Sequence, residues 1–116
     1  MGDDFYATIK LVTGEELLAH VLWMEEDNLL LVSNAITVKE ENISPQPGVF
    51  VTVIIPNMWM KYSGEDSFVI ERKNILTISE LSPSAIEFYE ECFERALSSQ
   101  RQVISTNKIG ANTNNG

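Results

Sequence analysis

The side chains best suited to chemistry are few and lie far apart along the chain. The single histidine, His20, lies in an apolar run, and the single cysteine, Cys92, lies in an apolar helical stripe. His20 has no nucleophile or second metal ligand nearby in sequence, and Cys92 falls within the apolar stripe, so we expect structural roles for both. Glu15 and Glu16 could bind a cation or act as an acid–base pair, but turn carboxylates are usually only solvated. We therefore predict no enzyme, no metal site and no cofactor.

The basic pair Arg72-Lys73 is the strongest candidate for binding. If identical subunits assemble around a common axis, each would contribute one such pair. The pairs together would form a circle of positive charge able to bind phosphates. A solvated turn is the competing interpretation. Trp23, Trp59 and Tyr62 are large enough to stack on bases, although aromatic side chains in strands more often belong to a core or an interface.

The overall composition favours one acidic, folded domain. The chain has 116 residues and a formal net charge of −9, the opposite of the balance usual in nucleic-acid-binding proteins. No apolar run approaches the roughly 18 residues that a membrane helix needs, and the acidic N-terminus is unlike a signal peptide. With a lone cysteine, these features predict a cytoplasmic, reducing compartment and no membrane.

Strand-like runs separated by turn signals fill the first 80 residues. Gly14 is expected to make the tight turn between residues 5–12 and 16–24. A kink is expected at residues 33–35, before the run ITVKE. About five closely spaced strands without intervening helices predict a small barrel or a strongly bent sheet.

Two proline-containing segments interrupt this pattern. Residues 41–48, ENISPQPG, are expected to form a loop. Pro56-Asn57 is expected to end or bulge the strand over residues 49–55, because proline has no N–H to donate. Two short strands, residues 68–70 and 75–78, then flank a polar turn.

Helical periodicity appears once, near the C-terminus. Ser82 or Ser84 can cap this helix and Pro83 suits its first turn. Its apolar stripe consists of residues at helical spacing, namely Ile86, Tyr89, Phe93 and Leu97. The chain therefore divides into a barrel over 1–81, an amphipathic helix over 82–100 packed on the barrel or a neighbour, and a flexible tail over 101–116.

The strands carry more apolar surface than one small domain needs. Residues 17–24, 29–32 and 49–55 are apolar on both faces. Burial of apolar surface stabilises a protein by about 25 cal/mol per Å². A second face left in water would therefore lose several kcal/mol, a large part of a total free energy of unfolding of about 5–15 kcal/mol. Identical subunits that pair edge to edge in a closed ring would bury it. In the alternative, the C-terminal helix covers one face of a monomer or dimer.

Residues 9–19, IKLVTGEELLA, follow the pattern hydrophobic-x-hydrophobic-x-x-Gly-x-x-hydrophobic-x-Gly, with Ala19 at the second glycine. This hairpin resembles the first half-motif of the Sm-like (LSm) family of small β-barrels, which has that pattern. Gly14 then makes the turn, and small Ala19 lies where the strand bends sharply. Residues 70–78, IERKNILTI, are similar to the second half-motif. The order of the segments also resembles Sm-like proteins carried by marine phages.

This resemblance implies a mainly β fold, a strongly bent five-stranded antiparallel small barrel with a C-terminal helix. It implies a homo-oligomeric ring of about five to seven subunits and single-stranded RNA bound at the central loops. The residues implied for RNA binding are Asp27, Asn28, Arg72 and Lys73, and Arg72-Lys73 is similar to the Lys-His pair of the bacterial branch. The implied location is the cytoplasm of a bacterium or a phage-infected host.

The chain departs from the family pattern at the expected base-binding positions. Glu25 or Asp27 would stand for the family's aspartate, and Asn28 for its asparagine only after a register shift. Glu71 stands where the eukaryotic and archaeal pattern has arginine, and the helix is C-terminal instead of preceding the first strand. A structural ring whose acidic surface binds basic proteins is therefore the competing function.

Overall fold

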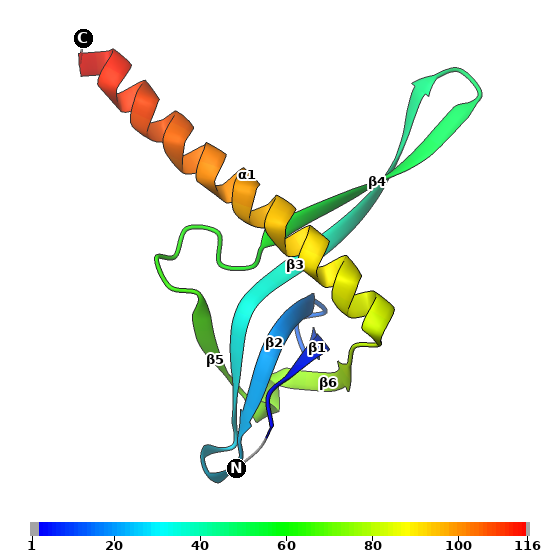
Figure 1. Cartoon of the computed structure of the whole chain (residues 1–116), viewed down its shortest axis with the longest axis vertical. Coiled ribbons are helices and arrows are strands. Elements are labelled where there is room, and N and C mark those ends of the chain that lie inside the picture. Colours follow the sequence, from blue (N-terminus) through cyan, green and yellow to red (C-terminus); the bar gives the residue numbers. More distant parts are fainter. Residues whose placement is uncertain (1–2, 116) are drawn as a thin grey trace.

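The chain forms a strongly bent antiparallel sheet of six strands, crossed by one long helix (Figure 1). The computed structural model describes the backbone of residues 3–115 and the side chains of residues 3–101. The predicted class, mainly β with a C-terminal helix, is confirmed. No helix in the described part is long and apolar enough to span a membrane.

The first two strands form the hairpin that the sequence predicts. β1 (Phe5–Leu11) pairs antiparallel with β2 (Glu16–Met24), with Thr8 opposite Leu18. Gly14 has φ 96° in the turn, a region that residues with a Cβ rarely adopt, and its N–H donates to the Leu11 carbonyl at 2.9 Å. β2 then pairs with β3, and the register shifts at Ala19.

The third strand is long and bends at Asn34. β3 (Leu29–Gln46) continues through this residue, which has φ 53°, so the predicted kink at 33–35 is a bend within one strand. Both β4 (Val49–Met58) and β5 (Ser67–Glu71) pair antiparallel with β3, with β4 along residues 36–46 and β5 along residues 29–33.

The two partners of β3 act as one interrupted strand. The segment 59–66 loops out between them opposite the bend, where Trp59 N–H donates to the Ala35 carbonyl and Asn34 N–H donates to the Asp66 carbonyl. The sheet consequently has six strands where about five were predicted. β6 (Ile75–Glu80) pairs with β1 at the other side of the sheet.

Two predictions about the prolines are wrong. Residues 41–46, predicted as part of a loop, belong to β3, and the chain turns at Gly48 with φ 80°. Pro56 does not end β4, since it pairs with Val38 inside the ladder. β4 lies at the edge of the sheet, where a proline is tolerated because one side of the strand needs no donor. We call the outer hairpin, residues 41–53, the arm.

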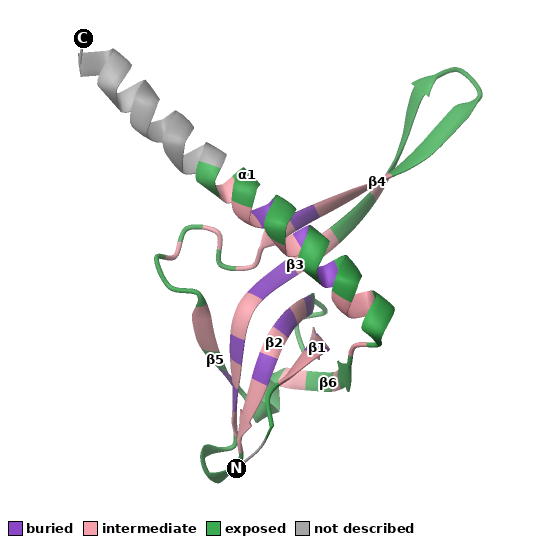
Figure 2. Ribbon diagram, in the orientation of Figure 1, coloured by how far each residue is buried: buried purple, intermediate pink, exposed green. Residues whose placement is uncertain are grey.

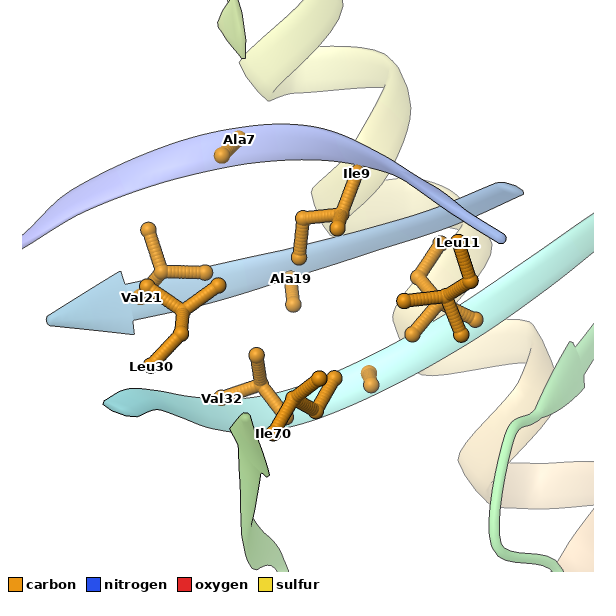
Figure 3. Packing of buried hydrophobic residues seen from close by; sticks show 10 residues of the cluster. Ala7, Ile9, Leu11, Ala19, Val21, Leu30, Val32 and Ile70 are labelled. Atoms are coloured by element: carbon orange, nitrogen blue, oxygen red, sulfur yellow. The ribbon is translucent and has the colours of Figure 1, made fainter. Parts of the chain in front are cut away.

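The main core lies inside the bent sheet (Figure 3). Side chains from alternate positions of β1, β2 and β3 meet there, as the period of two along a strand requires. The fully buried members, each at most 1% exposed, are Ala7, Ile9, Leu17, Ala19, Val21, Leu30 and Val32.

The helix α1 (Pro83–Asn115) covers the opposite face of β3 and β4. Ser82 caps it, because its Oγ accepts the Ala85 N–H at 3.3 Å. Tyr89, Cys92 and Ala96 pack against Ile36 as a second core. The helix continues past residue 100, where the sequence predicts its end. The flexible tail predicted for 101–116 stays a prediction, because the side chains of residues 102–116 lie outside the described part.

The helix buries part of the second apolar face of the sheet, and the arm leaves other apolar side chains exposed. Leu18, Val38 and Ile54, from the second face of the sheet, pack against the helix cluster. The arm projects beyond this contact and is almost wholly exposed (Figure 2). The helix therefore covers part of the second face of the inner sheet, while the arm still exposes apolar side chains. The choice between a ring and a monomer or dimer stays open.

Candidate nucleic-acid interface

The four residues predicted to bind RNA come together at one end of the sheet. Asp27 and Asn28 belong to the connection between β2 and β3, which contains the 3-10 turn η1 (Glu25–Asp27). Arg72 and Lys73 belong to η2 (Arg72–Asn74), between β5 and β6. The antiparallel pairing of β3 with β5 brings these connections side by side, and Arg72 N–H donates to the Asn28 carbonyl at 3.2 Å.

The conformation of Asn28 makes this contact possible. Its φ of 56° lies in the left-handed region, which asparagine tolerates better than most residues with a side chain. Its own N–H donates to the Glu25 carbonyl at 3.2 Å and closes η1, while its carbonyl accepts from η2. Asn28 therefore lies in a tight turn directly before β3, and its equivalence to the family's asparagine stays a prediction.

A guanidinium–indole pair forms beside this contact. The Arg72 guanidinium carbon lies 5.2 Å from the centre of the Trp23 ring, within the range of a cation–π interaction. Trp23 is half-buried at the end of β2, and Arg72 is exposed. A planar cation held over an indole ring offers a flat surface on which a nucleobase can stack.

Lys73 lies at the edge of a surface hollow. Its Nζ is 3.1 Å from Glu71 Oε2, and both side chains are largely exposed, so this ion pair is weak and exchangeable. Lys73 and Asn74 line a hollow of about 570 Å³ together with Trp59 and Val69. The lining also contains Glu15 and Glu71, so one cation lies beside two carboxylates and an apolar wall suited to the face of a base.

The charge at this end does not favour an anion. Four carboxylates, from Glu25, Glu26, Asp27 and Glu71, belong to the two connections, against the two cations of Arg72 and Lys73. A single subunit therefore offers little net attraction to phosphate, and any binding here depends on local placement of the cations.

The other polar candidates have structural partners. His20 Nε2 lies 2.8 Å from Asp4 Oδ2, and its ring meets Tyr6 edge to face with the ring centres 5.0 Å apart. Glu16 accepts from the Thr8 hydroxyl at 2.7 Å. Glu15 accepts from Trp59 Nε1 at 3.2 Å. The two glutamates therefore accept hydrogen bonds from different partners.

Of the remaining candidate residues, some are packed in the interior and one is exposed. Cys92 is buried in the helix core, where burial raises the pKa of its thiol, as expected for inert packing. Trp59 packs edge to face on Phe68, and Tyr62 is 80% exposed in the loop 59–66. No group of three or more possible metal ligands occurs in the part of the chain that the structure describes.

The pairing of Trp23 with Arg72 is the feature that sequence reasoning missed. Both residues were candidates, but they are far apart in sequence and follow different strands. The pairing of β3 with both β2 and β5 brings them together, because it places the end of β2 and the start of η2 at the same end of the sheet.

Comparison with known proteins gives one family. The Sm_like domain matches residues 8–90, which contain nearly all of the sheet, both connections and the first turns of α1. A search of curated proteins found no match.

Proposed function

We propose, from the premise that this chain belongs to the Sm-like family, that it forms a homo-oligomeric ring that binds single-stranded RNA without catalysis. The family typically forms homo-oligomeric rings and is generally non-catalytic. The binding end would be the one formed by η1 and η2. The observation that carries the proposal is the contact between Arg72 N–H and the Asn28 carbonyl, which gathers all four predicted residues.

The unpaired edges of the sheet support the proposed ring. Within the described residues, β4 pairs only with β3 and β6 pairs only with β1, so each strand has one unpaired side. Unpaired edges are templates for another strand, and a head-to-tail contact between identical subunits closes into a ring when its rotation allows.

The binding mechanism combines stacking with local neutralisation. A base would stack on the flat surface made by Arg72 and Trp23, while Lys73 exchanges Glu71 for a phosphate oxygen. A ring repeats these cations once per subunit, so that a strand of RNA meets several of them in succession.

The test is titration of uridine-rich and adenosine-rich single-stranded RNA at two salt concentrations, followed by fluorescence anisotropy. Lys73→Gln should lower the affinity several-fold and make the salt dependence shallower, because each phosphate contact contributes about 0.7 to the slope. Lys39→Gln is the matched control, because the Lys39 Nζ is also 3.1 Å from a carboxylate two residues away, that of Glu41, but lies on β3 outside the interface. The absence of any binding at low salt would refute the proposal.

A second function, a scaffold ring that binds basic proteins, is favoured by the excess of carboxylates at this end. The chain carries 17 acidic against 8 basic residues, and η1 consists entirely of acidic residues. In the same titration, binding of a lysine-rich peptide together with failure to bind RNA would support the scaffold.

A further inference from the structure

The outer part of the arm has an unusual composition for this chain. Residues 42–53 contain no charged side chain, although the whole chain has a formal net charge of −9. Phe50, beside the turn, is 78% exposed, and Ile43, Val49 and Val51 are each about two-fifths exposed. With no cation, this tip is unsuited to phosphate, and with no anion it can approach an acidic surface without repulsion.

The direction in which Phe50 points follows from its strand. Side chains alternate along β4, so Phe50 lies on the same face as Ile54, and Ile54 packs against the cluster under α1. By this alternation Phe50 belongs to the helix-bearing face of β4. The arm in which it lies extends beyond the part of the sheet that α1 crosses (Figure 1).

A hollow of suitable size lies on that face near the start of the helix. Its volume is about 380 Å³. Its lining consists of Thr8, Glu16 and Glu40 together with the apolar side chains of Leu18, Val38, Leu81, Ala85 and Phe88. Phe88 at its wall is 41% exposed, whereas Leu81 and Ala85 are half-buried. A phenyl ring removes about 150–250 Å² from water when it is buried, and here it would cover part of the exposed Phe88 as well.

In the proposed ring, β4 of one copy would pair antiparallel with β6 of the next. β4 has 10 residues and β6 has 6, so β4 would extend past β6. A register with Met58 beside Ile75 would place the start of β4 beyond Glu80 of that copy, next to Leu81 and the first turn of α1. The arm tip of one subunit would then face the hollow of the next.

We propose that Phe50 of one copy inserts into this hollow of the adjacent copy and fastens the ring. This inference rests on the ring of the proposed function, and it adds a contact outside the paired edges. The occupant of the hollow is a second copy of this chain, because each subunit has both parts of the contact. The arm tip is aromatic, exposed and uncharged, so it can enter a mainly apolar hollow that also contains two carboxylates without repulsion.

Cross-linking between copies tests the contact directly. Two Cys92→Ala proteins, one with Phe50→Cys and the other with Ala85→Cys, are mixed, allowed to exchange subunits and treated with a short bis-maleimide. A product of twice the chain mass is expected. Tyr62→Cys replaces Phe50→Cys in the control, because Tyr62 is equally exposed, at 80%, but lies in the loop 59–66. This control should give little product.

A second measurement uses Phe50→Ala, which should leave the fold of the subunit intact because Phe50 is mostly exposed. The concentration at which rings dissociate should rise at least about tenfold, with no rise for Tyr62→Ala. If the wild type forms a ring but the cysteine pair gives no cross-link above the control, or Phe50→Ala leaves the dissociation concentration unchanged, the insertion is overturned and the ring stands. A wild-type protein that sediments as a monomer overturns both.

Discussion

Tyr89 connects the helix to the bend of the long strand. Its hydroxyl donates to the Asn34 carbonyl at 2.7 Å, and its ring lies near those of Tyr6 and Phe93. The side chain is 3% exposed. Burial, followed by the nearby Tyr6 and Glu90, raises the pKa of Tyr89 well above its ordinary value of about 10. The hydroxyl is therefore a fixed donor at neutral pH.

Replacement of Tyr89 by phenylalanine should lower the free energy of unfolding by about 1–2 kcal/mol near pH 7, because the Asn34 carbonyl loses its donor. The effect should change with pH. A raised pKa in the folded state gives stability that is complete below about pH 10 and is lost as the pH rises further. The wild type should thus lose about 1.4 kcal/mol per pH unit above pH 10 relative to Tyr89→Phe. Urea unfolding of the wild type and Tyr89→Phe between about pH 7 and 11 measures the loss at neutral pH and its change above about pH 10. The control is Tyr62→Phe, since Tyr62 is exposed.

The roles of single residues were predictable where they depend on local geometry. The turn at Gly14 and the alternatives for the helix cap needed only the chain on either side, and the structure selects Ser82 as the cap. The partners of Glu15 and His20 were not predictable, because Trp59 and Asp4 reach them only after the sheet has formed.

At the scale of elements, the β1–β2 hairpin depends on one backbone conformation. Gly14→Ala should cost about 1–2 kcal/mol, because a Cβ is strained at φ 96° even though nothing crowds it. Gly64→Ala is the matched control: no atom lies within 4 Å of its added Cβ either, and its φ lies outside the strained range. It should change stability by less than about 0.5 kcal/mol. Urea unfolding at one fixed protein concentration distinguishes the two, and equal losses would refute this role of Gly14.

Element boundaries were predictable where turn residues agree with the strand pattern, as in β2, whose bounds match the prediction. They were not predictable around the prolines. Pro56 reads as a strand end in sequence, but β4 is an edge strand and tolerates it. Likewise, the mostly polar residues 41–46 belong to β3 because β4 pairs with them. Nothing in their own sequence indicates this pairing.

At the scale of the whole molecule, the chain is more extended than a compact domain. Its radius of gyration is 17.2 Å, whereas about 13 Å is expected for a compact chain of this length. The arm and α1 project from the bent sheet (Figure 1). Such projections expose apolar surface in a lone subunit, as Phe50 and Val51 show.

Sedimentation at micromolar concentration should therefore give a mass that is a multiple of 13.0 kDa. The mass should persist at about 1 M salt, since screening weakens exposed ion pairs but leaves apolar contacts and backbone pairing largely intact. A single well-behaved species of 13.0 kDa would contradict self-association.

The sequence by itself determined the fold class, the first hairpin, the apolar stripe of the helix and the residues of the two connecting turns. These follow from periodicity and from residues such as Gly14, whose preferences act over a few neighbours. Only the tertiary structure decided that the two turns touch through Arg72 and Asn28, that Trp23 lies under Arg72, and that the arm continues past the helix. The physical reason is that strand pairing joins residues distant in the chain, and the period of side chains along a strand does not specify which partner it will meet.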